Sequence, residues 1–289
     1  MRTKIQSFMT YYIWIVLALV FVLLSGAVIT LFGAWDDQKS RKTQLLSITE
    51  GVSSLLDSEV AISQARLIGL ATSPLLLVGD IKSFHSQMQR TPMPEGTLLA
   101  ISNRERQLAN TLRPYGTELP KLSAYKPQPM FYETLESKGF YISSRVFGPI
   151  AKTSNVTVSI RIPLDRNMIQ YILTTVITDR RMLDVMRSSE NLPPNARVLL
   201  MDAMGQQLVS FPNQQNDVTT ESIAAASGLT KFVVGSSASG IFRGHGSDGV
   251  VTAYFRSPLS GWTVALAVDA SSIDRPVNRA IRLLVVLAG

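Results

Sequence analysis

The stretch Tyr254-Phe-Arg-Ser-Pro-Leu-Ser-Gly-Trp-Thr-Val264 decides the fold, because it predicts two strands joined by a tight turn. Ser257-Pro258 and Gly261 supply the turn, since proline fixes φ and glycine accepts backbone conformations that other residues avoid. From Trp262 to Val268, large apolar residues alternate with Thr or Ala, as expected for a strand that buries one face. We therefore expect Trp262 to be a core residue rather than a ligand contact.

Short runs rich in Val, Ile, Thr and aromatic residues, bounded by Gly, Pro, Asn and Lys, predict two groups of strands. The first group comprises 97–102, 107–111, 140–147, 156–162 and 170–178, and the second comprises 197–201, 206–211, 240–243, 250–256 and 262–268. A short helix is expected near residues 81–89. The predicted fold class is α+β, with antiparallel sheets covered by helices on one side.

An internal repeat divides this region into two modules. Residues 100–110 align without gaps on residues 200–210, so that Gln107-Leu108 matches Gln207-Leu208, and each copy predicts a strand, a polar turn and a strand. We expect related modules in tandem, a membrane-distal one over 73–190 and a membrane-proximal one over 191–278.

A long amphipathic helix is predicted before the first module, over residues 36–72. Apolar residues recur there at helical spacing with polar residues between them, namely Leu45, Ile48, Val52, Leu55 and Ile62. Glu59 falls on the same stripe, so we expect one face to pack on the adjoining domain rather than to form only a coiled coil. Ser73-Pro74 ends the helix, because the residue before proline avoids the α region.

An uncharged run of 24 residues, 11–34, precedes this stalk and predicts a transmembrane helix. Arg2 and Lys4 lie before it and Asp36 and Asp37 after it, so the positive-inside rule places residues 1–10 in the cytoplasm and the bulk of the chain outside. The alternative, a cleavable signal peptide, is disfavoured because its apolar region is usually only about 7 to 15 residues long.

At the other end, Arg279 and Arg282 lead into seven residues, 283–289, that predict the start of a second transmembrane helix over 279–289. These arginines then lie on the outer side, where the positive-inside rule does not favour them, although large translocated domains obey that rule weakly. The alternative is an amphipathic or buried terminal helix.

Composition argues against several classes of function. The net charge is +7, but residues 35–278 carry 24 basic and 21 acidic side chains without an aromatic-interleaved basic stripe, which disfavours nucleic-acid binding. There is no cysteine, and the two histidines, His85 and His245, are far apart, so we expect no metal site, no cofactor and no catalytic residue. We interpret 244–249 as a hairpin turn and His245 as a solvated turn residue.

Several segments together resemble the double Cache family of PAS-like sensor domains. They are Arg197-Val-Leu-Leu-Met-Asp202 with Gly205, Gly240-Ile-Phe-Arg-Gly244, Asp248-Gly249 and the hairpin 254–264. Members of this family lie outside the membrane in bacterial histidine kinases, chemoreceptors and diguanylate cyclases. The order of parts matches along nearly the whole chain, and the C-terminal third is most similar to sensor histidine kinases.

The resemblance implies a ligand-sensing receptor module, with a small ligand held between the distal sheet and the loop and helix over it. Aromatic residues with arginines beyond them could enclose a small organic anion there, and the candidate ligand-binding residues are Tyr125, Phe131, Tyr141, Arg145 and Arg161. The segment 125–130 lacks the Arg and Trp of amino-acid-binding members, so an amino-acid ligand is not predicted.

The expected protein is thus the input part of a sensor histidine kinase, a homodimer in the inner (plasma) membrane with most of its mass in the periplasm. Kinase or cyclase activity would lie beyond residue 289. The alternatives are the sensor part of a diguanylate cyclase or chemoreceptor, and a membrane-tethered module that binds a periplasmic protein without a small ligand. An anchored hydrolase is disfavoured because no Gly-x-Ser-x-Gly elbow is present.

Overall fold

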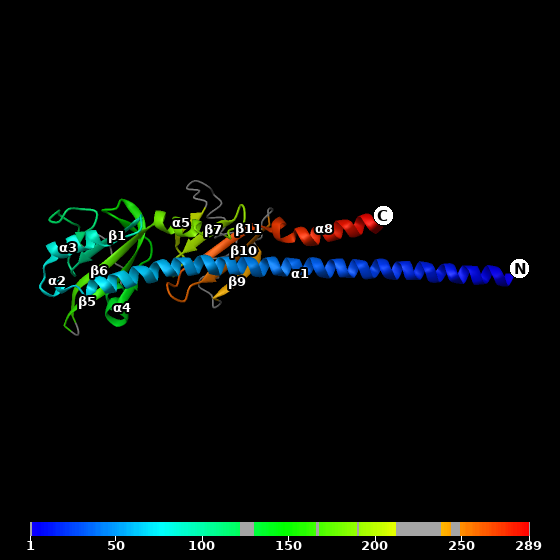
Figure 1. The fold of residues 1–289 in the computed structure, drawn as a ribbon, viewed down its shortest axis with the longest axis horizontal. Helices are drawn as coiled ribbons and strands as arrows, with labels where there is room; N and C mark the ends of the chain where they lie inside the picture. The colour runs from blue at the N-terminus through cyan, green and yellow to red at the C-terminus, as the bar shows by residue number, and fades with distance from the viewer. Residues whose placement is uncertain are drawn as a thin grey trace.

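A single long helix organises the molecule. The computed structural model describes residues 2–121, 130–165, 168–189, 191–211, 238–243 and 249–288. Helix α1 (Arg2–Ala71) has 70 residues and is therefore about 105 Å long. Two β-sheet modules lie along its C-terminal half, and helix α8 (Ala270–Ala288) runs beside it, so that both termini extend away from the modules in the same direction (Figure 1).

The N-terminal part of α1 projects beyond both modules, and its exposed side chains are apolar. Trp14, Phe21 and Phe32 are each more than 60% exposed, at 68%, 71% and 65%. Within the described residues, α1 is the one helix that is long and apolar enough to cross a membrane. The predicted stalk continues this helix without a break to Ala71.

The C-terminal part of α1 is the spine of the main hydrophobic core. Its buried apolar side chains face the sheets at steps of four and seven residues, and they are Leu45, Val52, Leu56, Val60 and Leu67. Leu55 and Ile62, predicted on this packed stripe, are instead 39% and 47% exposed. That part of the prediction was wrong because the sheets contact a face centred on Leu56 and Glu59, next to the face that carries Leu55 and Ile62.

The distal module begins with α2 (Pro74–Leu77) and α3 (Ile81–Arg90). Its six-stranded antiparallel sheet has the order β2-β1-β6-β5-β3, with β4 also paired to β5. The strands are β1 (Thr97–Ser102), β2 (Gln107–Asn110), β3 (Phe140–Ile142), β4 (Val146–Gly148), β5 (Thr153–Asp165) and β6 (Met168–Thr178). Helix α4 (Phe131–Lys138) precedes β3 and contacts β3 and β5.

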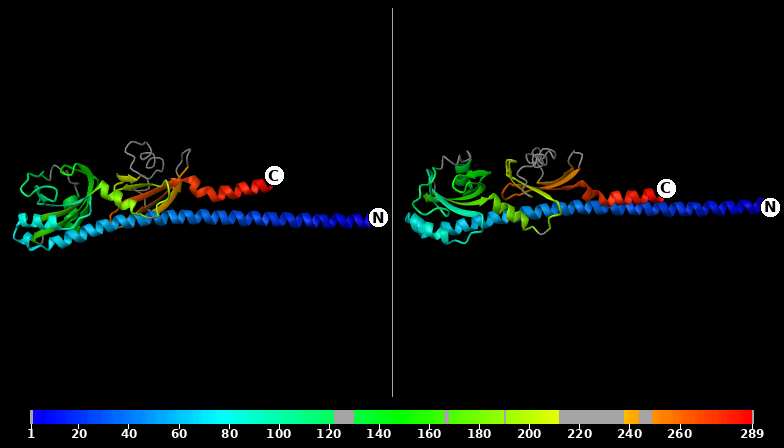
Figure 2. Two further views of the ribbon diagram at one scale, coloured as in Figure 1. Left: turned by 45° about the horizontal axis from the view of Figure 1, so that its top comes forward. Right: turned by 90° about the horizontal axis from the view of Figure 1, so that it is seen from above.

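Helix α5 (Asp179–Arg187) connects this sheet to the proximal one. The five-stranded proximal sheet is antiparallel, with the order β8-β7-β11-β10-β9. Its strands are β7 (Arg197–Met201), β8 (Gln207–Phe211), β9 (Ser239–Arg243), β10 (Val250–Arg256) and β11 (Thr263–Asp269). The two sheets follow one another along α1, as the rotated views make plain (Figure 2).

The strand order is the same in both sheets: the second strand lies at one edge, then the first, the last, the one before it, and the third. This confirms the α+β class and the two tandem modules. Asn103 and Asp202 have equivalent roles, since the side-chain oxygen of each accepts two backbone N–H groups of the following turn. Ser102 pairs with Gln107 in the distal hairpin, and Met201 pairs with Gln207 in the proximal one. The proximal turn is therefore one residue longer. The gapless alignment of 100–110 on 200–210 is correct in the second strand of each hairpin but is shifted by one residue in the first.

Candidate ligand-binding face of the distal module

The outer face of the distal sheet, opposite α1, carries the candidate site. Strand β5 alternates strictly here: Val156, Val158 and Ile160 are buried in the core shared with α1. Thr157, Ser159 and Arg161 therefore point to the other face, because successive side chains of a strand alternate. The same face of β6 carries Ile172 and Thr174, which lie directly opposite Arg161 and Ser159.

An aromatic wall closes one side of this face. The ring centroids of Phe131 on α4 and Tyr141 on β3 are 5.0 Å apart in an edge-to-face arrangement, and those of Phe131 and Tyr132 are 4.9 Å apart. Leu135 and Ile172 complete the cluster beneath them. Burial raises the pKa of the Tyr141 hydroxyl, and the negative charge of Asp202 raises it further, so this group stays protonated. The wall can pack against the apolar part of a ligand while keeping a polar rim.

Arg161 stands beside this wall. It lies opposite Ile172 in the β5–β6 pairing, and its backbone N–H donates to the Gly139 carbonyl at 3.3 Å. Its side chain is partly buried, and within the described residues no carboxylate lies within ion-pairing distance of it. A guanidinium in such a place can bind a carboxylate through two parallel hydrogen bonds.

The floor between β5 and β6 is polar. The Ser159 and Thr174 hydroxyl oxygens lie 3.0 Å apart. Ser102 on β1 is buried and lies opposite Ile172 on β6. Sequence reasoning did not single out these hydroxyl groups. The alternation of apolar and polar residues along β5 was the signal that could have found Ser159, because it puts Ser159 and Arg161 on one face.

Arg145 is placed differently. Its guanidinium is 3.0 Å from Asp179, the first residue of α5. Burial raises the pKa of the Asp179 carboxyl, and the charge of Arg145 opposes that rise. Arg145 precedes Val146, which pairs with Asn155, whereas Tyr141 pairs with Ser159. Four positions along β5, about 13 Å, thus separate Arg145 from the aromatic wall, and its ion pair ties the β3–β4 segment to the helix between the modules.

A small cavity of about 60 Å³ lies near Arg145 on the same face, lined by Leu98, Asn110, Ile150 and Thr157 among others. At roughly 30 Å³ per water molecule, this cavity has room for about two waters and is too small for a metabolite. Of the five predicted site residues, the structure brings three together on the outer face of the distal sheet, namely Phe131, Tyr141 and Arg161. Tyr125 lies in 122–129, outside the described residues.

Two polar contacts fasten the modules to the stalk. From the proximal side, Ser257 and Ser260 each donate a hydroxyl hydrogen bond to the Asp57 carboxylate, at 2.7 and 2.9 Å. From the inter-module helix, Arg181 Nη2 lies 2.7 Å from Glu59 Oε2, and this hydrogen bond raises the pKa of the arginine. A rotation of either module therefore acts directly on α1.

The chemistry for catalysis by metal ions is not assembled in the described part of the chain, where no cluster of three His, Asp or Glu side chains could hold an ion. His85 is buried, and its Nε2 lies 2.9 and 3.1 Å from the carbonyl oxygens of Asn110 and Arg113. Because both neighbours accept hydrogen bonds, Nε2 carries the proton and acts as a structural donor. His245 and the rest of 244–248 lie outside the described residues.

Comparison with known proteins shows which solved structures have a similar fold. No family model and no curated protein matches the chain. Among solved structures, the periplasmic sensory domain of the Campylobacter jejuni chemoreceptor Tlp1 matches with a TM-score of 0.59 and 13% identity, covering 83% of this chain and 99% of that one. The ligand-binding domain of C. jejuni Tlp3 in complex with L-valine matches with a TM-score of 0.55 and 14% identity, covering 85% and 98%.

The extracellular domain of soHK1S-Z6, described as a histidine kinase, matches with a TM-score of 0.51 and 13% identity over 83% of this chain and 97% of that one. The chain therefore has the fold of extracytoplasmic sensory domains, which agrees with the double Cache resemblance predicted from its sequence.

Proposed function

We propose that the chain is the extracytoplasmic sensing part of a transmembrane signal-transduction receptor. The observation that carries this proposal is Arg161, which has no carboxylate partner among the described residues. It stands beside the aromatic wall, on the outer face of a sheet whose inner face is joined to a long helix. A ligand on this face would contact β3, β5, β6 and α4 together. Its binding energy could therefore bias two arrangements of the sheet on the stalk.

The proposed ligand is a small organic carboxylate. Arg161 would hold the carboxylate, the hydroxyls of Ser159 and Thr174 would accept or donate hydrogen bonds, and Phe131 and Tyr141 would cover the apolar part. Tlp3, a structure of the same fold, holds L-valine, so amino acids are suitable first probes. The carboxylate is the part of an amino acid that Arg161 recognises, and an ammonium group is not required in this proposal.

Replacing Arg161 by Gln is expected to weaken carboxylate binding by about 10- to 100-fold, because a charge-assisted hydrogen bond contributes about 1.5–3 kcal/mol. The measurement is isothermal titration of the full chain in detergent with a library of short carboxylates and amino acids, in which each amino acid is tested beside its decarboxylated amine. The amines are expected not to bind.

Arg145→Gln is the matched control, since it removes the same charge from the same module but acts at an ion pair with Asp179. Its affinity for the carboxylate should remain within about twofold of wild type. Equal losses in both variants, or binding of an amine in preference to its parent acid, would rule out the role proposed for Arg161.

The anchoring that we propose follows from the apolar N-terminal part of α1. Residues 11–34 would cross the inner membrane with 1–10 in the cytoplasm, and the modules would lie in the periplasm. Helix α8 would lead into a second span from residue 279. The modules occupy 73–190 and 191–278 in this proposal, and they carry no catalytic activity of their own.

A parallel homodimer is proposed on the exposed face of α1. Small and apolar side chains recur there at alternating steps of four and three residues, the spacing of a coiled-coil seam. All six are exposed, and they are Gly51, Leu55, Ser58, Ile62, Ala65 and Gly69. The partner is a second copy, since two chains anchored in one membrane present this seam to each other in the same direction.

The double variant Leu55→Lys/Ile62→Lys is expected to weaken the dimer at least about 100-fold, because it places four lysines in a seam that buried four aliphatic side chains. Light scattering of the full chain across a dilution series measures this. The control, Leu77→Lys/Val78→Lys, alters two residues that are 83% and 77% exposed at the distal tip. A dimer that the seam variant leaves intact would contradict the proposed interface.

The output remains a separate proposal, a histidine kinase, with a chemoreceptor or a diguanylate cyclase as the alternative. The gene sequence after codon 289 tests it directly. A membrane-tethered module that binds a periplasmic protein is the second candidate function, favoured by the exposed side chains of Leu77 and Val78 at the distal tip. Failure of every carboxylate to bind, together with protein capture that Leu77→Lys abolishes, would favour it.

A further inference from the structure

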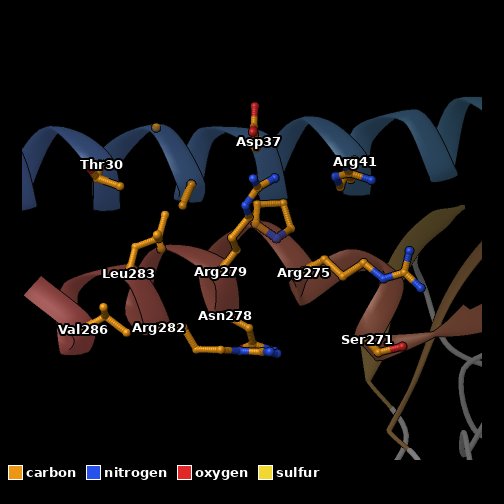
Figure 3. A pocket seen from close by; sticks show the side chains of 14 residues that line it. Thr30, Asp37, Arg41, Ser271, Arg275, Asn278, Arg279, Arg282, Leu283 and Val286 are labelled. Carbon is orange, nitrogen blue, oxygen red and sulfur yellow. The ribbon is translucent and has the colours of Figure 1, made fainter.

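A groove lies between α1 and α8 at the base of the proximal module. It has a volume of about 990 Å³, and from α1 it is lined by Thr30, Gly33, Ala34, Asp37 and Arg41. Helix α8 contributes the opposite wall, and Leu283 and Arg279 point from it toward α1 (Figure 3). The small side chains of α1 create the space, since a Cβ added at Gly33 would meet no atom within 4 Å.

The groove is cationic. Arg41, Arg275 and Arg279 line it, and Arg282 stands at its edge, pointing away from α1 (Figure 3). Across the described residues, none of these four makes an ion pair. The Asp37 side chain points away from α8.

Two further acids near the groove are already engaged. Asp269, which lines a neighbouring pocket with Arg41 and Arg275, forms an ion pair with Arg197 at 3.4 Å. The second is Asp274. It forms an ion pair with Arg243 and accepts a hydrogen bond from Gln38 at 2.7 Å. No ion pair among the described residues therefore neutralises the positive charge of the groove.

The polarity of the groove changes along its length. Gly33, Leu283 and Val286 form an apolar end, and Arg41 and Arg275 form a charged end. From Gly33 to Arg41 the helix rises about 12 Å. Trp35, which is 57% exposed, lies between them at the end of the uncharged run, where aromatic rings mark the edge of a bilayer. An acyl chain matches the first end and a phosphate headgroup matches the second.

We propose that this groove binds the headgroup of an anionic phospholipid of the outward-facing leaflet, with Arg41, Arg275 and Arg279 around the phosphate. This rests on the membrane anchoring proposed above. The planar guanidinium groups match the geometry of phosphate oxygens. The site also accounts for the arginines before residue 283, which the positive-inside rule leaves unexplained, and it would clamp α1 to α8 where a signal enters the membrane.

The test uses the full chain in vesicles of phosphatidylcholine that contain a minor fraction of phosphatidylglycerol. After mild extraction, mass spectrometry counts each lipid retained by the protein. Wild type should be enriched in phosphatidylglycerol. Arg41→Gln, Arg275→Gln and Arg279→Gln should each lower that preference about fivefold, and the three Arg→Lys variants should keep most of it, because the charge remains.

The matched control is the triple Arg90→Gln/Arg106→Gln/Arg113→Gln variant, which removes three exposed charges from the distal module and should keep the wild-type preference. The proposal is overturned if the triple variant Arg41→Gln/Arg275→Gln/Arg279→Gln retains as much phosphatidylglycerol as wild type, or if the control triple variant loses as much. It is also overturned if inorganic phosphate at the concentration of the lipid headgroup displaces the lipid, because the site then selects a free anion.

Flotation with pure phosphatidylcholine vesicles separates the two proposals. If the chain does not float, the proposed anchoring is wrong. If it floats but shows no preference between the lipids, the anchoring stands and the headgroup site is wrong.

Discussion

Trp262→Ala is expected to destabilise the protein by about 3–5 kcal/mol, the range for removing a buried large aromatic side chain. Trp262 is 3% exposed and belongs to the core that joins the proximal sheet to α1. The β10–β11 turn also depends on its position, because Ser257 N–H donates to the Trp262 carbonyl at 2.8 Å. A smaller side chain leaves a cavity next to the contacts that hold Asp57. Urea unfolding followed by far-UV circular dichroism measures the loss.

Phe147→Ala is the control for this experiment. Phe147 lies on β4 and is 63% exposed, so its removal is expected to change the free energy of unfolding by less than about 0.5 kcal/mol. Equal costs for the two substitutions would mean that Trp262 is not a core residue. That result would also reopen the interpretation of the hairpin from which the fold was predicted.

The parts of the fold that could be predicted are those in which local chemistry and burial agree. Gly261 adopts φ +71°, as the turn after Ser257-Pro258 requires, and Trp262 is buried in the way its alternating pattern predicts. The strand predicted over 97–102 has the same bounds in β1. In both modules an Asn or Asp fixes the turn between the first two strands through its own side chain, which is a signal that lies entirely in neighbouring residues.

The parts that could not be predicted depend on tertiary partners. Helices α4 and α5 were not expected, and the run predicted as one strand over 140–147 is divided into β3 and β4. Helix α5 has a local start signal, since Thr178 caps it by accepting from the Arg181 N–H. Its buried face, however, is defined by tertiary contacts with α1, β5, β6 and β8. Arg145 and Arg161 look alike in sequence, yet only the fold gives one of them Asp179 and leaves the other beside an aromatic wall.

The role of Glu59 also depends on a tertiary partner that the sequence does not reveal. In the sequence it interrupts an apolar stripe, and in the structure it is 7% exposed and paired with Arg181 on α5. A residue that weakens a coiled-coil pattern thereby links the stalk to the helix between the two modules. The distal sheet, through β6 and α5, and the proximal hairpin, through Asp57, contact α1 within one helical turn of each other.

Glu59→Met is expected to cost about 3 kcal/mol, because it leaves the Arg181 guanidinium facing an apolar side chain. The value lies at the lower end of the range for broken buried pairs, since the Arg181 side chain is 27% exposed and keeps part of its hydration. The double variant Glu59→Met/Arg181→Met removes both charges and should lie within about 1 kcal/mol of wild type. Urea unfolding of wild type, both single variants and the double variant measures the coupling energy.

A double variant that is as unstable as the sum of the two single variants would show that the pair contributes no coupling. Hydrogen exchange adds a second readout with a distinct expectation. Glu59→Met should accelerate exchange in α5 more than in β10 and β11, because Asp57 and its two serines still hold the proximal hairpin on α1. If exchange rises equally in both modules, the stalk responds as one unit and the two contacts are not separate fastenings.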